Sequence, residues 1–135
     1  LAEKPPEEAE AVFSVITGAR DRALALIAEG LEAGRPVTGA EVDRETRAFL
    51  TNAGYGAYIA HRTGHGIDTE VHGCGVNLDS VEFPDHRTII EGSCFSVEPG
   101  LYLEHFGLRT EINAYRRNDR VIVSGGPVQT VLLTL

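Results

Sequence analysis

The sequence predicts an α+β domain in which two helices pack on a mainly antiparallel sheet. Residues up to Gly54 carry apolar residues at helical spacing, whereas the rest of the chain breaks into short β-prone runs separated by Gly, Pro, Asn and Asp. Helices that precede the strands, rather than alternating with them, favour an antiparallel sheet. The 135 residues, 42% hydrophobic and 24% charged, suffice for one compact unit spanning 1–135.

The first helix is predicted to begin near residue 6 or 7 and to end within 30–36. Pro5 and Pro6 precede three glutamates, and this order favours a helix N-terminus because acidic groups interact well with its positive dipole end. Apolar residues then recur every three or four positions, at Val12, Ile16, Ala19, Ala23 and Ile27. We interpret this segment as a core helix.

A second helix is predicted to follow Thr38. The segment from Thr38 to Glu41 has the form of a capping box, and Gly54 stands where a helix commonly ends. The residues between them that share one face are Val42, Thr46, Phe49 and Leu50. This helix is also interpreted as scaffold.

Short runs beyond Gly54 predict five to seven strands. The β-prone runs are 55–61, 67–71, 93–98, 101–103, 107–115, 121–124 and 128–133. Irregular loops are expected at 73–91 and 116–120.

Composition narrows the class of function. The chain has 12 basic and 20 acidic residues and a net charge of −8, which argues against nucleic acid as a partner. Its longest aliphatic run, 23–28, is too short to cross a membrane, and no signal-peptide pattern opens the chain. Two cysteines, Cys74 and Cys94, are expected to be free thiols in a cytoplasmic protein.

Histidines cluster in one short segment. Three of the five, His61, His65 and His72, fall within twelve residues. Gly64 and Gly66 disfavour a helix there, so an extended or looped backbone is expected. His61 and His65 could then point together, while His72 would need a bend to join them. By itself the cluster leaves open a metal or catalytic role and a surface turn.

Carboxylates occur at two strand ends. Glu98 closes the run 93–98 before Pro99, and Arg109, Glu111 and Asn113 alternate with less polar residues on one face. By itself, this polar strand face would be interpreted as a surface exposed to solvent. Together with the histidines, the two glutamates form a mixed nitrogen and oxygen set that suits Mn²⁺, Fe²⁺, Co²⁺ or Zn²⁺.

Three motifs resemble the pita-bread metallopeptidases, a family that includes aminopeptidase P, prolidase and creatinase. The segment 61–72 resembles the family's H-x-x-G-H-x-x-G…V-H motif, 95–102 its T/S-x-E-P-G-x-Y motif, and 107–111 its G-x-R-x-E motif. Their order and separations match as well. The resemblance runs from the first helix to the C-terminus.

The resemblance implies site residues and a reaction. His65, Glu98 and Glu111 would be metal ligands, His61 and His72 would bind substrate and help move protons, and Arg109 would orient Glu111 or a neighbouring acid. Two divalent ions, Mn²⁺ in first place with Co²⁺, Zn²⁺ or Fe²⁺ as alternatives, would activate a water that hydrolyses the bond before proline in a peptide substrate. No protein nucleophile is then required.

The sequence departs from the family pattern at three positions. The family ordinarily has Gly at Asp68, an acid at Gly73 and an acid at Ile112. Members also take two aspartate ligands from strands upstream of the first helix, so we expect 1–135 to be the C-terminal part of a pita-bread catalytic domain. Such a chain is expected to be inactive alone and to pair its open sheet edge, for example with another copy.

Two other functions remain open at this point. One is a creatinase-like amidinohydrolase that works without metal, and metal content would separate it from a metallopeptidase. The other is a non-catalytic pita-bread module that binds partners; such modules tend to lose the ligand residues, which are present here at His65, Glu98 and Glu111.

Overall fold

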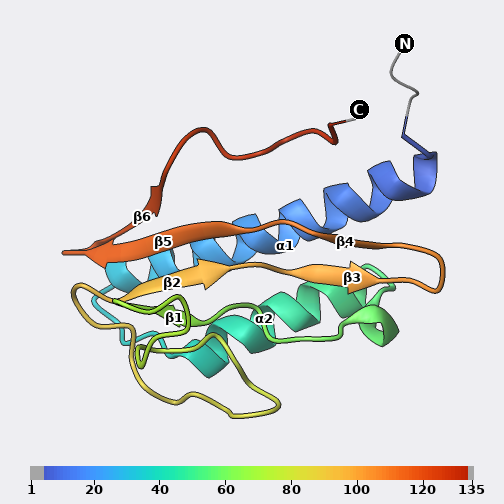
Figure 1. Cartoon of the computed structure of the whole chain (residues 1–135). Helices are drawn as coiled ribbons and strands as arrows, with labels where there is room; N and C mark the ends of the chain where they lie inside the picture. Colours follow the sequence, from blue (N-terminus) through green and yellow to red (C-terminus); the bar gives the residue numbers. More distant parts are fainter. Residues whose placement is uncertain (1–4, 134–135) are drawn as a thin grey trace.

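A computed structural model describes residues 5–133, and it places two helices behind a layer of antiparallel strands (Figure 1). The helices are α1 (Glu7–Glu32) and α2 (Gly39–Asn52), followed by a short 3₁₀ turn, η1 (Gly56–Tyr58). The strands are β1 (Gly66–Ile67), β2 (Cys94–Val97), β3 (Gly100–Tyr102), β4 (Gly107–Arg109), β5 (Ile112–Arg117) and β6 (Arg120–Ser124). Within 5–133 no helix is both long and apolar enough to traverse a bilayer.

Both predicted helices are confirmed, with bounds close to those expected. α1 begins at Glu7 directly after Pro6 and ends at Glu32, ahead of Gly34 at a φ of 65°. In α2 the Thr38 side chain accepts a hydrogen bond from the Glu41 N–H at 3.3 Å. Only half of the capping box forms, because the Glu41 carboxylate pairs with Arg35 at 2.7 Å.

Two ladders make one long hairpin. The main sheet has the order β1-β2-β5-β6, and β3 pairs with β4 in a second ladder. The register continues unbroken between them, since Val97 pairs with Ile112 on one side of the interruption and Gly100 with Arg109 on the other. Inside the interruption the Thr110 N–H donates to the Pro99 carbonyl at 3.3 Å.

The core forms two clusters that α1 joins. The larger lies between the helices and the four-stranded sheet and includes Ile27, Val42 and Phe95. The smaller lies beneath β3 and β4 and includes Ile16, Leu50 and Leu101. Because one helix packs on both clusters, the two ladders are held as a single layer.

Several predicted strands are wrong. The run 55–61 forms η1 and irregular chain, because the Tyr55 N–H closes the end of α2 on the Leu50 carbonyl and the Tyr58 N–H closes the next turn on the Tyr55 carbonyl. In 67–71 only Ile67 is extended, since the Asp68 carboxylate binds the N–H groups of Glu70 and Cys74 in place of a ladder.

The C-terminal strands also differ from expectation. The run 107–115 is divided between β4 and β5, and no strand forms within 128–133 in the described part of the chain. The expected loop at 116–120 shortens to a two-residue turn at Asn118 and Asp119, with Asn118 at a φ of 56°. The predicted loop at 73–91 is irregular as expected and holds only isolated bridge residues.

Candidate metal centre

His65 lies in a buried segment between β2 and the loop that contains Leu78. Its backbone N–H donates to Ser96 Oγ at 3.0 Å, and its carbonyl accepts the Ser96 N–H at 2.9 Å. Gly64 just before it pairs with Leu78 on the opposite side. A Cβ at residue 64 would overlap the Ser96 carbonyl, so only glycine allows this close approach.

Glu98 meets the His65 ring directly after β2. Its Oε1 lies 3.4 Å from His65 Nε2 and accepts a hydrogen bond from Ser96 Oγ at 3.1 Å. The other ring nitrogen of His65, Nδ1, lies 3.1 Å from the Gly66 carbonyl, which can only accept, so Nδ1 carries a proton. In a neutral ring, Nε2 therefore presents a lone pair to a carboxylate oxygen, and a cation or a proton between the two atoms stabilises that arrangement.

Glu111 lies across the hairpin from Glu98. The unbroken register places Glu98 opposite Glu111, and opposite residues of an antiparallel pair project to the same face. Arg109 joins them, with one guanidinium nitrogen 3.4 Å from Glu98 Oε2 and the other 3.7 Å from Glu111 Oε2. Both carboxylates thus share one face and one cation.

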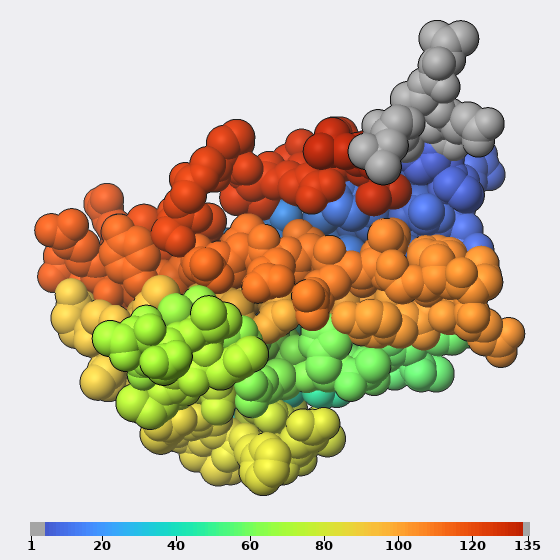
Figure 2. All heavy atoms as spheres, in the orientation of Figure 1, coloured from blue at the N-terminus to red at the C-terminus, as the bar shows by residue number. Residues whose placement is uncertain are grey.

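The other two histidines lie differently. His72 is exposed, and the chain bends after β1 so that its ring centroid comes within 4.3 Å of that of His65. The segment after β1 stands out from the front surface (Figure 2). His61 instead binds the Tyr102 hydroxyl through Nε2 at 2.9 Å and the Arg62 carbonyl through Nδ1 at 2.7 Å.

The structure thus gathers five of the six predicted site residues: His65, His72, Glu98, Arg109 and Glu111. The donor set fits part of a metal site, because an imidazole and two carboxylates are ligands that divalent transition ions prefer. Within 5–133, however, no group of three or more His, Cys, Asp or Glu side chains is arranged to enclose an ion. The ligand and catalytic roles of these residues stay predictions.

Asp43 is a buried acid that the sequence analysis missed. It lies on α2, is fully buried, and binds Thr63, Ser80 and Arg47. Burial raises the pKa of this carboxyl, but the hydrogen bonds from Ser80, Thr63 and Arg47 and the charge of Arg47 outweigh it, so the pKa lies below its usual value. The available signal was an acid three positions before Thr46 and seven before Leu50, on the helix face that is buried.

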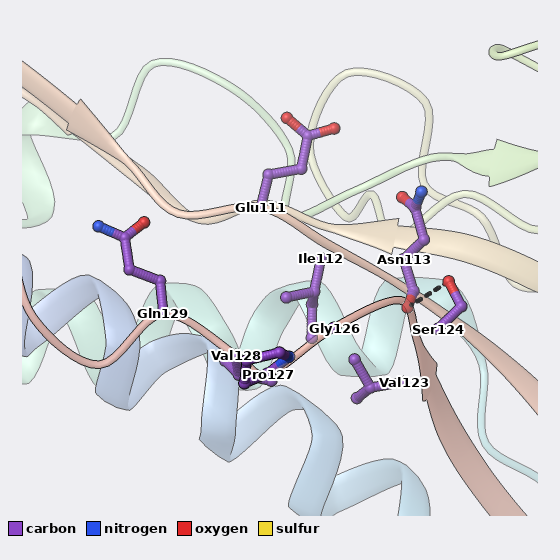
Figure 3. A pocket seen from close by; sticks show the side chains of 9 residues that line it. All are labelled: Glu111, Ile112, Asn113, Val123, Ser124, Gly126, Pro127, Val128 and Gln129. Atoms are coloured by element: carbon purple, nitrogen blue, oxygen red, sulfur yellow. Dashed lines mark hydrogen bonds between the residues drawn. The ribbon is translucent and has the colours of Figure 1, made fainter.

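A cavity of about 470 Å³ opens beside Glu111. β6 ends at Ser124, whose hydroxyl donates to the Asn113 carbonyl at 3.3 Å, and the chain then turns away. In Figure 3 the Glu111 and Asn113 side chains point to one side of β5, while Ile112 and Val123 lie toward the helices. The residues that line this cavity therefore include both polar side chains, such as Glu111 and Asn113, and apolar ones, such as Ile112 and Val123.

Comparisons with known proteins point to one family. The sequence model of Metallopeptidase family M24 matches residues 1–124. An Xaa-Pro dipeptidase of Lactobacillus delbrueckii subsp. lactis is 42% identical over 83 residues, which is 60% of this chain and 22% of that protein. The chain therefore spans about a fifth of this relative.

Solved structures agree with the fold. The X-Pro aminopeptidase of Thermotoga maritima MSB8 has a TM-score of 0.78 and 30% identity, over 95% of this chain and 34% of the other. An Xaa-Pro dipeptidase from Bacillus anthracis has a TM-score of 0.79 and 25% identity, over 98% and 35% of the two chains. The pita-bread architecture is confirmed, and the chain belongs to metallopeptidase family M24.

Proposed function

We propose that residues 1–135 supply one side of the dinuclear metal centre of an Xaa-Pro peptidase. His65, Glu98 and Glu111 are the ligands in this proposal, and two further aspartate ligands come from a segment outside these 135 residues. The peptidase relatives, which match the chain over only part of their own length, support it.

The observation that carries the proposal is the contact between His65 Nε2 and Glu98 Oε1 at 3.4 Å. The Gly66 carbonyl fixes the tautomer of His65, and Ser96 holds both the His65 backbone and the Glu98 carboxylate. Two donor atoms are thereby aimed at one point before any ion arrives. Metal ions bound there would lower the pKa of a coordinated water.

We assign roles to the remaining site residues, and their positions support these assignments. His72 is exposed and stacks near the His65 ring, so it can receive a proton from, or donate one to, a substrate. Arg109 holds Glu98 and Glu111 toward each other. His61, hydrogen-bonded to Tyr102, contacts substrate from the β3 side of the site.

Finer points of the proposal concern metal, location and association. Mn²⁺ is the proposed ion, the substrate is a peptide with proline in second position, and the free thiols of Cys74 and Cys94 fit a cytoplasmic protein. The isolated chain is proposed to be inactive, because two carboxylates cannot balance two divalent ions. We also propose that two copies of the chain associate through an open strand edge, and sedimentation would measure that association.

A chimera tests the function. Residues 1–135 replace the structurally matching segment of the Thermotoga maritima X-Pro aminopeptidase, and an Xaa-Pro peptide is assayed with Mn²⁺. We expect hydrolysis by the chimera, none by the isolated chain, and at least a hundredfold loss in chimeras carrying Glu98→Gln or Glu111→Gln. Glu104→Gln, at an exposed acid outside the site, is the matched control.

Three results would contradict the proposal. Turnover by the isolated chain would remove the need for external ligands. Turnover that persists after chelation would favour the metal-independent amidinohydrolase chemistry. A folded chimera that binds no Mn²⁺ would favour a non-catalytic module.

A further inference from the structure

We infer that Asp43, on α2, is a positioning residue that sets the distance between His65 and Glu98. The inference extends the proposed function, because it assigns a role to a residue outside the predicted ligand set. It rests on a hydrogen-bond path that runs from the α2 carboxylate to the backbone of Glu98 through Thr63.

The two oxygens of the Asp43 carboxylate serve two different segments. Oδ1 accepts the Thr63 N–H at 2.8 Å and the Thr63 hydroxyl at 2.7 Å. Oδ2 accepts the Ser80 N–H at 2.8 Å, the Ser80 hydroxyl at 2.6 Å and the Arg47 Nε–H at 2.8 Å. A fully buried carboxylate with this many donors holds its partners firmly, because the loss of any one hydrogen bond leaves a buried negative charge less well compensated.

Thr63 passes this constraint to both predicted ligands. Its carbonyl accepts the Glu98 N–H at 2.7 Å, and it stands two positions before His65 in the same irregular segment. Thr63 is thus clamped between the Asp43 carboxylate on one side and the backbone of Glu98 on the other.

Arg47 anchors the other end of the histidine segment. Its Nε–H binds Asp43, and one of its terminal nitrogens donates to the His61 carbonyl at 3.1 Å. Residues 59–63 form no β-ladder, so the hydrogen bonds from the Asp43 and Arg47 side chains hold their backbone in place of strand pairing. One turn of α2 therefore positions His61 and, through Thr63, His65.

Matched variants separate positioning from simple stabilisation. Thr63→Val and Ser80→Ala each remove one hydroxyl that donates to the Asp43 carboxylate, but only Thr63 lies in the segment that carries the histidines. Thr63→Ser keeps the hydroxyl and serves as the rescue. Asp43→Asn removes the charge and leaves one set of donors without an acceptor.

The first measurement uses the metal-free 135-residue chain. Two-dimensional NMR follows the proton contact between the His65 ring and the Glu98 side chain and the exchange rate of the His65 amide. We expect Asp43→Asn and Thr63→Val to weaken the contact and to speed exchange at least tenfold relative to α1 amides. Ser80→Ala and Thr63→Ser should leave both unchanged after correction for global stability. Equal effects of Thr63→Val and Ser80→Ala would overturn the inference, even if Asp43→Asn fails to fold.

The second measurement is the affinity of the same variants for Mn²⁺ by calorimetry. We expect weaker binding in Asp43→Asn and Thr63→Val and unchanged binding in Ser80→Ala. If the folded chimera with the Thermotoga maritima aminopeptidase binds no Mn²⁺, the proposed function fails, while the metal-free NMR comparison still decides the role of Asp43.

Discussion

The two sides of the candidate centre are positioned by different kinds of interaction. Glu98 and Glu111 follow from the register of one long hairpin, whose backbone bonds place them opposite each other. His61 and His65 lie in a segment with almost no ladder, held by the Asp43 carboxylate and by a glycine packed against a carbonyl. A strand pair positions side chains through its backbone, whereas an irregular segment needs specific buried side chains.

The strand side should depend most on apolar packing. Phe95, on β2, is fully buried in the larger core cluster, so Phe95→Ala is expected to lower the free energy of unfolding by about 3–5 kcal/mol. Phe83→Ala is the control, because Phe83 is 75% exposed and its loss should change stability by less than about 0.5 kcal/mol. Urea unfolding measures both, and equal costs would contradict the placement of Phe95.

The histidine side should be destabilised most by a substitution at Gly64. A methyl group there overlaps the Ser96 carbonyl, so Gly64→Ala is expected to cost about 3 kcal/mol through overpacking. Gly126→Ala, whose added Cβ would meet open space, is the matched control. A mild effect of Gly64→Ala in urea unfolding would show that the segment is not packed against β2.

Acid should weaken the histidine side as well. Two buried carboxyls, Asp43 on α2 and Asp85 in the loop 73–91, have pKa values below their usual values, because hydrogen bonds and the charges of Arg47 and Arg87 outweigh the opposing effect of burial. Their contribution to the free energy of unfolding is therefore complete above the unfolded-state pKa of about 4, and it disappears as the pH falls through the lower folded-state pKa. Urea unfolding between pH 6 and pH 2.5 should show this decline, and Asp43→Asn should make it shallower. An equally steep decline in the variant would contradict the assignment.

The smallest effect is expected at the start of α2, the helix that carries Asp43. Thr38→Ala removes the side-chain acceptor of the Glu41 N–H and should cost about 1 kcal/mol. Thr38→Ser, which keeps the hydroxyl, should cost less than half as much. The same loss in both variants would show that the cap contributes through the methyl group instead.

Sequence patterns predicted the strand side of the molecule more completely than the histidine side. Helical spacing and the Pro-Glu start predicted α1, and the alternation of Arg109, Glu111 and Asn113 agrees with the face that Arg109 and Glu111 share. The bend that brings His72 to His65 depends on Asp68 binding backbone N–H groups, a tertiary detail that β-propensity does not reveal. Asp43 was missed because a single acid on a helix resembles an exposed residue until its partners from two loops are known.

Mn²⁺-induced line broadening in the NMR spectrum of the 135-residue chain tests the central claim most directly. If His65 and Glu98 aim their donors at one cation, substoichiometric Mn²⁺ should selectively broaden the resonances of His65, His72 and Glu98. Glu98→Gln should abolish that broadening, while Glu104→Gln should preserve it. Broadening confined to the acidic first turn of α1, or broadening at His65 that survives Glu98→Gln, would contradict the claim.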